Sequence, residues 1–140
     1  MLATIGVVDH MHRTTQTLTA SMLVCDAVNQ LLSKNLSGLP VVNEQGAVIG
    51  FLSEQDCIRS MLSSSYYCEN TKLVGEVMMP DPLVLDVNES VVQAAENMIT
   101  HKLRVFPIIN QGALVGYITR ADILRALHTH LRTCSLPAHA

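Results

Sequence analysis

The chain contains one sequence pattern twice. The run LPVVN at residues 39–43 recurs as FPIIN at residues 106–110, and GFLSEQD at residues 50–56 recurs as GYITRAD at residues 116–122. A tandem repeat of this length predicts two similar units that pack on each other, with equivalent clefts between them. We therefore expect function at the interface of the repeats rather than in a single catalytic pocket.

Length and composition indicate one folded module without a general affinity for polyanions. The 140 residues are 49% hydrophobic and 15% charged, which is typical of a globule with a sizeable core. The net charge of -3 and the lack of a basic run argue against nucleic acid or an anionic membrane surface as a partner. No run approaches the roughly 18 apolar residues of a membrane span, and no secretory signal opens the chain. We therefore expect a cytoplasmic protein.

The cysteines and histidines form no recognisable metal or disulfide pattern. The cysteines at positions 25, 57, 68 and 134 are scattered without a CxxC motif, which predicts free thiols in a reducing compartment. The histidine pairs at positions 10 and 12 and at positions 128 and 130 have no acidic or cysteine partner at ligand spacing. We therefore expect no metal site.

Each repeat has the element order β-α-β-β-α, which indicates an α/β (α+β) fold class. A helical spacing of apolar residues follows Val24 and Val91, and Ser90 with Gln93 forms a capping-box signature. Glycines 46 and 112 predict hairpin turns between short buried strands. The strands are expected at residues 17–18, 39–42 and 48–52, and again at 83–87, 105–109 and 114–118. Second helices begin at Ser53 and Thr119.

A polar linker joins the two repeats. Residues 63–71 are mostly polar, and prolines 80 and 82 favour an extended segment before the second repeat. The last residues lack helical periodicity, which indicates a frayed end. We therefore assign residues 1–64 to the first repeat, 65–75 to the linker, 76–132 to the second repeat and 133–140 to a flexible tail.

A hydroxyl residue followed by an aspartate three positions later ends the second strand of each repeat. These pairs are Ser53 with Asp56 and Thr119 with Asp122. One interpretation is an ordinary helix cap with an acid in the first turn. However, aspartate is shorter than the glutamate or glutamine preferred in a capping box, which favours a second role. Free amides at a helix start attract phosphate, and a carboxylate can accept both hydroxyls of a ribose, so the pairs also suit a nucleotide.

The ordered set of motifs resembles the cystathionine β-synthase (CBS) domain. Its pieces are VDHM at residues 8–11 and EVMMP at 76–80, GLPVV at 38–42, GFL at 50–52, and the two Ser/Thr-x-x-Asp ends. The resemblance covers roughly residues 5–131, nearly the whole chain. The chain therefore looks like a CBS pair, or Bateman module, standing alone.

This resemblance implies two repeats related by pseudo-twofold symmetry whose clefts bind an adenosyl ligand: AMP, ADP, ATP or S-adenosylmethionine. Asp56 and Asp122 would hold the ribose hydroxyls. The groups that would face the phosphate are Ser53, Thr119, Arg120 and Arg104. The residues implied to enclose the adenine are Leu39, Pro40, Val84, Val105, Phe106 and Pro107.

The two copies differ in charge where a phosphate would bind. The second repeat has Arg104 and Arg120, whereas the first has Ser37 and Glu54 at the matching positions. Arginine attracts a polyanion and glutamate repels it. We therefore expect unequal sites, with the Asp122 copy preferring phosphorylated ligands.

Three functions follow from these features. The first is a regulatory sensor whose adenosyl ligand acts through a separate, unidentified partner protein, with no further cofactor required. The second is a ligand-free oligomerisation or protein-interaction module, and the apolar helices after Asp56 and Asp122 favour a homodimer. The third is an enzyme, which we reject because no nucleophile, base or metal cluster accompanies the aspartates. The retained Ser/Thr-x-x-Asp pairs favour the sensor.

Overall fold

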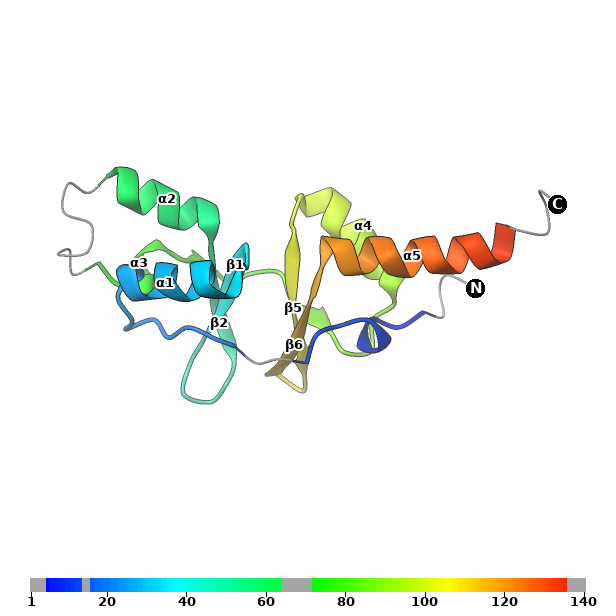
Figure 1. Ribbon diagram of the computed structural model, residues 1–140. Helices are drawn as coiled ribbons and strands as arrows, with labels where there is room; N and C mark the ends of the chain where they lie inside the picture. Colours follow the sequence, from blue (N-terminus) through cyan, green and yellow to red (C-terminus); the bar gives the residue numbers. More distant parts are fainter. Residues whose placement is uncertain (1–4, 14–15, 64–71, 136–140) are drawn as a thin grey trace. The chain divides into compact units, whose positions relative to one another are not determined.

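A computed structural model describes residues 5–13, 16–63 and 72–135, with side chains up to residue 132. The chain forms two compact units (Figure 1). Unit 1 contains residues 5–13, most of the second repeat and the C-terminal helix. Unit 2 contains the first repeat from residue 16, the segment up to Leu83, and residues 111–114 at the turn before and the start of β6 (Ala113–Thr119). The units therefore do not coincide with the sequence repeats, because each takes its leading segment from the other repeat.

Unit 2 is a three-stranded sheet with helices packed against it. Its strands have the order β1-β2-β3, and both neighbouring pairs are antiparallel. Leu18 adds an isolated parallel bridge to Val41 of β1. The elements are α1 (Val24–Lys34), β1 (Gly38–Val42), β2 (Val48–Ser53), α2 (Glu54–Leu62), α3 (Val74–Val77) and β3 (Met79–Pro80).

The core of unit 2 follows the apolar spacing of its sequence. Helix α1 buries one face and ends where Asn35 adopts the left-handed conformation, with a φ of 54°. The side chains that α1 buries pack with alternate residues of β1 and β2. The buried cluster consists of Leu18, Ala27, Leu31, Leu39, Val41, Leu52, Cys57 and Val74.

Unit 1 repeats this plan with a sheet of order β4-β5-β6, in which β4 runs parallel to β5. The Ser90 hydroxyl accepts a hydrogen bond from the Gln93 amide at the start of α4. The elements are the 3-10 helix η2 (Val7–Asp9), β4 (Leu85–Asp86), α4 (Val91–His101), β5 (Val105–Asn110), β6 (Ala113–Thr119) and α5 (Arg120–Ser135). The buried cluster consists of Val7, Leu85, Val91, Ala94, Met98, Phe106, Ile108, Ile118, Ile123 and Ala126.

The N-terminal segment is part of the unit 1 fold. Val7 is fully buried in its core, and His12 pairs with Tyr117 of β6 through two backbone hydrogen bonds of 2.8 and 2.9 Å. Gly116 permits this approach, because a Cβ atom there would collide with the His12 carbonyl oxygen. In unit 2, β3 takes the same place beside β2, where Met79 pairs with Phe51. The two segments therefore occupy matching positions in the two units.

The predicted α/β class and the main helices and strands are confirmed. The strand expected at residues 17–18 is only the isolated bridge at Leu18, because a two-residue stretch makes few ladder hydrogen bonds. The tail predicted from residue 133 begins too early, since α5 continues to Ser135 and Pro137 lies beyond that point. Residues 72–75 of the predicted linker are ordered, and residues 64–71 lie outside the described part. The pseudo-twofold relation of the repeats stays a prediction.

Candidate functional site

Both Ser/Thr-x-x-Asp pairs form reciprocal helix caps. In α2, the Asp56 amide donates to Ser53 Oγ at 3.1 Å and the Ser53 amide donates to Asp56 Oδ2 at 3.0 Å. In α5, the matching distances between Thr119 and Asp122 are 3.2 and 2.8 Å. The aspartate, whose shorter side chain made a capping box less evident from the sequence, therefore completes the box in both helices.

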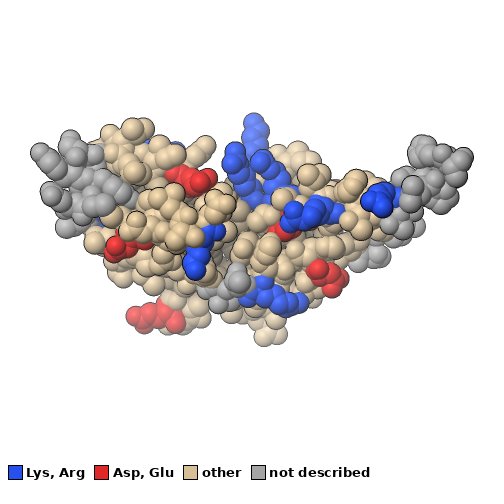
Figure 2. Space-filling model, in the orientation of Figure 1, with Lys and Arg blue, Asp and Glu red and all other residues tan. Residues whose placement is uncertain are grey.

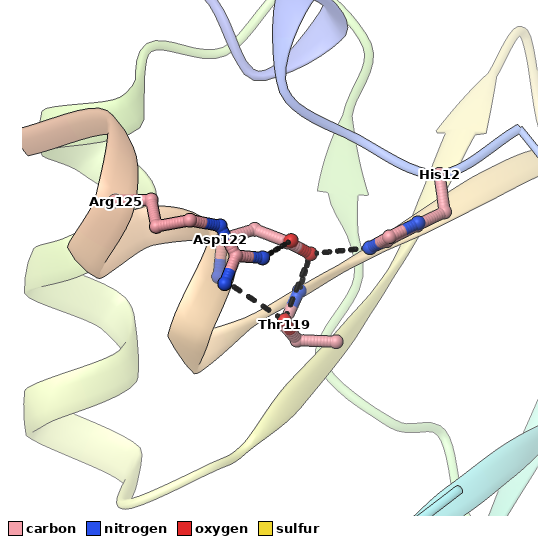
Figure 3. A network of polar contacts seen from close by, with 4 residues as sticks. All are labelled: His12, Thr119, Asp122 and Arg125. Carbon is pink, nitrogen blue, oxygen red and sulfur yellow. Dashed lines mark hydrogen bonds and ion pairs between the residues drawn. The ribbon is translucent and has the colours of Figure 1, made fainter. Parts of the chain in front are cut away.

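Asp122 is the most heavily bonded carboxylate among the described residues. Its side chain is only 6% exposed (Figure 3). Oδ2 accepts hydrogen bonds from the Thr119 amide and hydroxyl, both at 2.8 Å, and lies 2.8 Å from His12 Nε2. Oδ1 accepts from Arg125 at 2.7 Å. Burial alone would raise the pKa of Asp122, but the Thr119 hydrogen bonds, the His12 charge and Arg125 together hold this pKa below its ordinary value of 3.8.

Asp56 has fewer partners than Asp122. Its side chain is 14% exposed, Oδ2 accepts from the Ser53 amide, and Oδ1 accepts from Arg59 at 3.2 Å. Arg59 and Arg125 occupy the same position in the two repeats, three residues after the aspartate. The difference lies at His12, because the residue that pairs with β2 at the matching place is Met79. A thioether cannot donate a hydrogen bond to a carboxylate.

The charge difference predicted between the repeats is present at matching backbone positions. The Arg120 amide donates to the Arg104 carbonyl at 2.8 Å, and the Glu54 amide donates to the Ser37 carbonyl at 2.9 Å. The same backbone bond thus holds two exposed arginines together in unit 1 and a serine beside a glutamate in unit 2. Figure 2 shows Lys and Arg side chains gathered near the start of α5.

The residues expected to enclose an adenine are mostly buried. Leu39 and Phe106 are 3% and 0% exposed and belong to the two core clusters. Any contact of a ligand with these two positions must therefore involve their backbone. Pro40 and Pro107 are also buried, while Val84, just before β4, and Val105, the first residue of β5, are half-buried. In unit 1, Thr119 and Asp122 cap the start of α5, where the Arg120 amide bonds to the Arg104 carbonyl.

Sequence reasoning missed three residues of this arrangement. Arg59 and Arg125 could have been found, because each stands one helical turn after its aspartate in both repeats. His12 carries no such signal, since 110 positions separate it from Asp122 in the numbering and no local pattern links them. Only the fold brings the N-terminal segment to β6.

The prediction that all cysteines are free thiols is wrong for Cys25, which is disulfide-bonded. Spacing alone could not reveal this bond, because it depends on tertiary contacts. The cysteine pattern therefore no longer supports a reducing compartment. Cys57 is free and buried, and burial, then the charges of Asp56 and Glu54, raise the pKa of its thiol to about 11. Such a thiol is inert at neutral pH.

The described part of the chain also bears on metal binding and membrane insertion. There, no three or more His, Cys, Asp or Glu side chains are grouped so that they could bind a metal ion. Within the same residues, none of the helices has the length and apolar character that crossing a membrane requires.

Comparison with known proteins identifies the family. The CBS domain model matches residues 7–63 and again residues 74–129. The chain belongs to the CBS domain family. This CBS pair is 28% identical over 111 residues to MJ1225 of Methanocaldococcus jannaschii, covering 79% of the chain and 39% of that protein. It is 31% identical over 122 residues to the methylated protein MJ0556 of the same organism, covering 81% of the chain and 67% of that protein.

A solved structure shows the same fold. The CBS pair matches the crystal structure of CBSX2, an Arabidopsis thaliana protein, in complex with AMP with a TM-score of 0.79 and 28% identity. The match covers 91% of the chain and 99% of that structure. Both the family and the α/β class of the repeats are thereby confirmed. Since the chain spans well under half of MJ1225, the activity of that whole protein does not transfer to it.

The lowered pKa of Asp122 predicts how stability depends on pH. Because the folded pKa lies below 3.8, the carboxylate contributes its full stabilisation above about pH 3.8 and loses it as the pH falls through the folded value. We expect Asp122→Asn to have a lower free energy of unfolding at neutral pH and a flatter decline below about pH 4. Urea denaturation across this range measures both. Glu96→Gln, at an exposed position of α4, is the control and should keep the wild-type slope. Equal acid slopes for Asp122→Asn and wild type would contradict the prediction.

Proposed function

We propose that the CBS pair is a regulatory module that binds an adenosyl ligand and acts through a separate partner protein. The observation that carries this proposal is the group at the start of α5, where a capped helix, a buried carboxylate and two exposed arginines lie together. Helix starts and arginines suit a phosphate, and a carboxylate suits a ribose. The likeness to CBSX2, whose structure contains AMP, supports the same ligand class.

In this proposal Asp122 accepts the ribose hydroxyls, and Arg104, Arg120 and Thr119 face the phosphate. The adenine lies against the backbone at Val84 and the start of β5. AMP, ADP and ATP are the candidates for this site because its arginines favour phosphorylated ligands. S-adenosylmethionine, which carries no phosphate, suits the Asp56 site better, because Glu54 replaces arginine there.

The proposal assigns binding rather than catalysis to both sites. Each aspartate is already engaged as a helix cap and in an ion pair with an arginine one turn later. A carboxylate held by several donors is a weak base, because those donors stabilise its charged form. The lowered pKa of Asp122 agrees with this description. The ligand is thus a regulator, and no further cofactor is required.

The first test compares the two aspartates. We expect ligand-stripped protein to bind AMP saturably in a calorimetric titration, with ADP, ATP and S-adenosylmethionine titrated in parallel. Asp122→Ala should weaken AMP binding at least about tenfold, since it removes hydrogen bonds to a charged acceptor. Asp56→Ala is a matched control, because it removes the same helix cap from the other unit. At a hundredfold excess over the dissociation constant, AMP should stabilise the wild type by about 2.7 kcal/mol.

Three outcomes separate the explanations. Loss of AMP binding in Asp122→Ala alone supports the assignment of the phosphorylated ligand to unit 1. Equal weakening in both variants indicates that stability, rather than a ribose contact, governs binding. No heat with any of the four compounds overturns the sensor and leaves the interaction module.

The second test exchanges the charges of the two repeats. Arg104→Ser with Arg120→Glu gives unit 1 the residues of unit 2. We expect the affinity loss to increase from adenosine to AMP to ATP, because each added phosphate charge strengthens the lost attraction. Titrations at low and high salt should show a smaller loss at high salt, where charges are screened. Ser37→Arg with Glu54→Arg is the reciprocal control and should not weaken binding. An equal loss for adenosine would show that the arginines do not contact phosphate.

A homodimer through α2 and α5 is the second part of the proposal. In a single chain, α2 exposes Ile58, Met61 and Leu62 by 54%, 40% and 84%, and α5 exposes Leu124 and Leu131 by 67% and 49%. Ile58 and Leu124 occupy matching positions in the two repeats. Large apolar side chains that recur at one position of both helices favour a protein interface. The same face serves the alternative function, a ligand-free oligomerisation module.

The oligomeric state tests this face. We expect the wild type to sediment as a dimer at micromolar concentration in analytical ultracentrifugation. Ile58→Glu with Leu124→Glu should shift it to the monomer, because burying an unpaired carboxylate in an interface is costly. Asn29→Glu, at an exposed polar position of α1, is the control and should remain dimeric. A monomeric wild type, or a dimer that survives the double substitution, would contradict the proposed interface.

A further inference from the structure

His12 contacts the Asp122 carboxylate, which the proposed function assigns to the ribose hydroxyls. Its backbone is fixed to Tyr117 on β6, and its ring stacks on the Tyr117 ring with centroids 4.8 Å apart and planes at 19°. This geometry aims Nε2 at Asp122 Oδ2, 2.8 Å away (Figure 3). The N-terminal segment therefore places a hydrogen-bond donor where a ribose hydroxyl would donate.

The hydrogen bonds of Asp122 leave little room for a further donor. Oδ2 already interacts with the Thr119 amide, the Thr119 hydroxyl and His12, whereas Oδ1 accepts from Arg125. A carboxylate oxygen offers about two lone-pair sites, so Oδ2 is saturated. A diol that donates to both oxygens must displace one of these donors.

His12 is the donor that can leave most readily. The two Thr119 donors belong to the helix cap, and their loss would uncap α5. His12 is 44% exposed, so its ring can rotate into solvent while its backbone stays on β6. An exchange of this donor costs only the interaction of a partly exposed pair.

Among the described residues, the other aspartate has no such donor. Asp56 Oδ2 accepts from the Ser53 amide, and Met79 stands at the place of His12 beside β2. The two matching carboxylates thus differ in whether the paired segment covers them. A general role in stabilising the fold would be expected in both units.

We propose that His12 is a specificity-determining residue that guards Asp122 and yields only to a ligand with intact ribose hydroxyls. This inference rests on the proposed function, because it concerns the same site. A ribose offers two hydroxyl donors in exchange for one imidazole donor. A ligand without these hydroxyls has nothing to exchange and leaves His12 in place. The guard therefore lowers the affinity for ligands with ribose hydroxyls, leaves the affinity for deoxy analogues unchanged, and narrows the difference between the two.

The test measures affinity for AMP and for 2′,3′-dideoxyadenosine monophosphate, which lacks both hydroxyls. His12→Phe keeps an aromatic ring on Tyr117 and removes the donor. We expect this variant to bind AMP roughly two- to fivefold more tightly than wild type, the factor that a partly exposed ion pair supplies. Its affinity for the dideoxy compound should be unchanged. His10→Phe, at an exposed position in the same segment, is the matched control and should behave as wild type.

Each outcome decides the matter. Tighter AMP binding confined to His12→Phe supports the guard. Equal or weaker AMP binding in His12→Phe overturns it, and so does an equal gain for the dideoxy compound. Binding to wild type with no effect of His12 leaves the proposed function intact, whereas no binding in any variant overturns both. Circular dichroism checks folding, and His12→Leu serves as the second variant if His12→Phe does not fold.

Discussion

The reciprocal hydrogen bonds between a hydroxyl residue and an aspartate at the start of α2 and α5 determine the geometry of both candidate sites. They fix where each strand ends and each helix begins, and they hold the carboxylate against the first turn. Because the same aspartate caps its helix with Oδ2, only its remaining lone pairs are available to a ligand. Helix capping and ligand binding would therefore use the same side chain. The neighbours of each aspartate determine how many of its lone pairs remain free.

The two repeats keep the same backbone at the helix start but differ in the charge of the side chains there. A single amide-to-carbonyl bond joins Arg120 to Arg104 in unit 1 and Glu54 to Ser37 in unit 2. The side chains at these positions do not belong to the buried cores, and Arg104, Arg120 and Glu54 are exposed, so their charge can change without loss of the fold. The cores themselves use matching apolar positions, such as Leu39 and Phe106. Duplication thus preserved the packing and left the surface at each helix start free to diverge.

Features set by local sequence could be predicted, and features set by tertiary contacts could not. The repeat, the apolar spacing and the glycine turns were sufficient for α1, α4 and the hairpins, and the charge contrast between Arg104 and Ser37 was visible directly. The exchange of leading segments could not be predicted, because Val7 and His12 pack in unit 1 against residues that are far from them in the sequence. The disulfide at Cys25 has the same character. The reciprocal caps depend on backbone conformation as well, which is extended at Ser53, so side-chain length alone does not indicate them.

The exchange of leading segments also explains how the two sites came to differ beyond their charges. Each segment lies beside the strand that leads into a capped helix, and in unit 1 one residue of the segment, His12, reaches the aspartate of that helix. A substitution in the segment alters the site without disturbing strand, helix or core. Asp56, in the unit where Met79 pairs with β2, is 14% exposed, whereas Asp122, which His12 contacts, is 6% exposed. Unit 1 therefore combines the two arginines at the start of α5 with the more heavily bonded carboxylate, so that in the proposed function a phosphorylated ligand gains attraction from the arginines and must compete with His12 for Asp122.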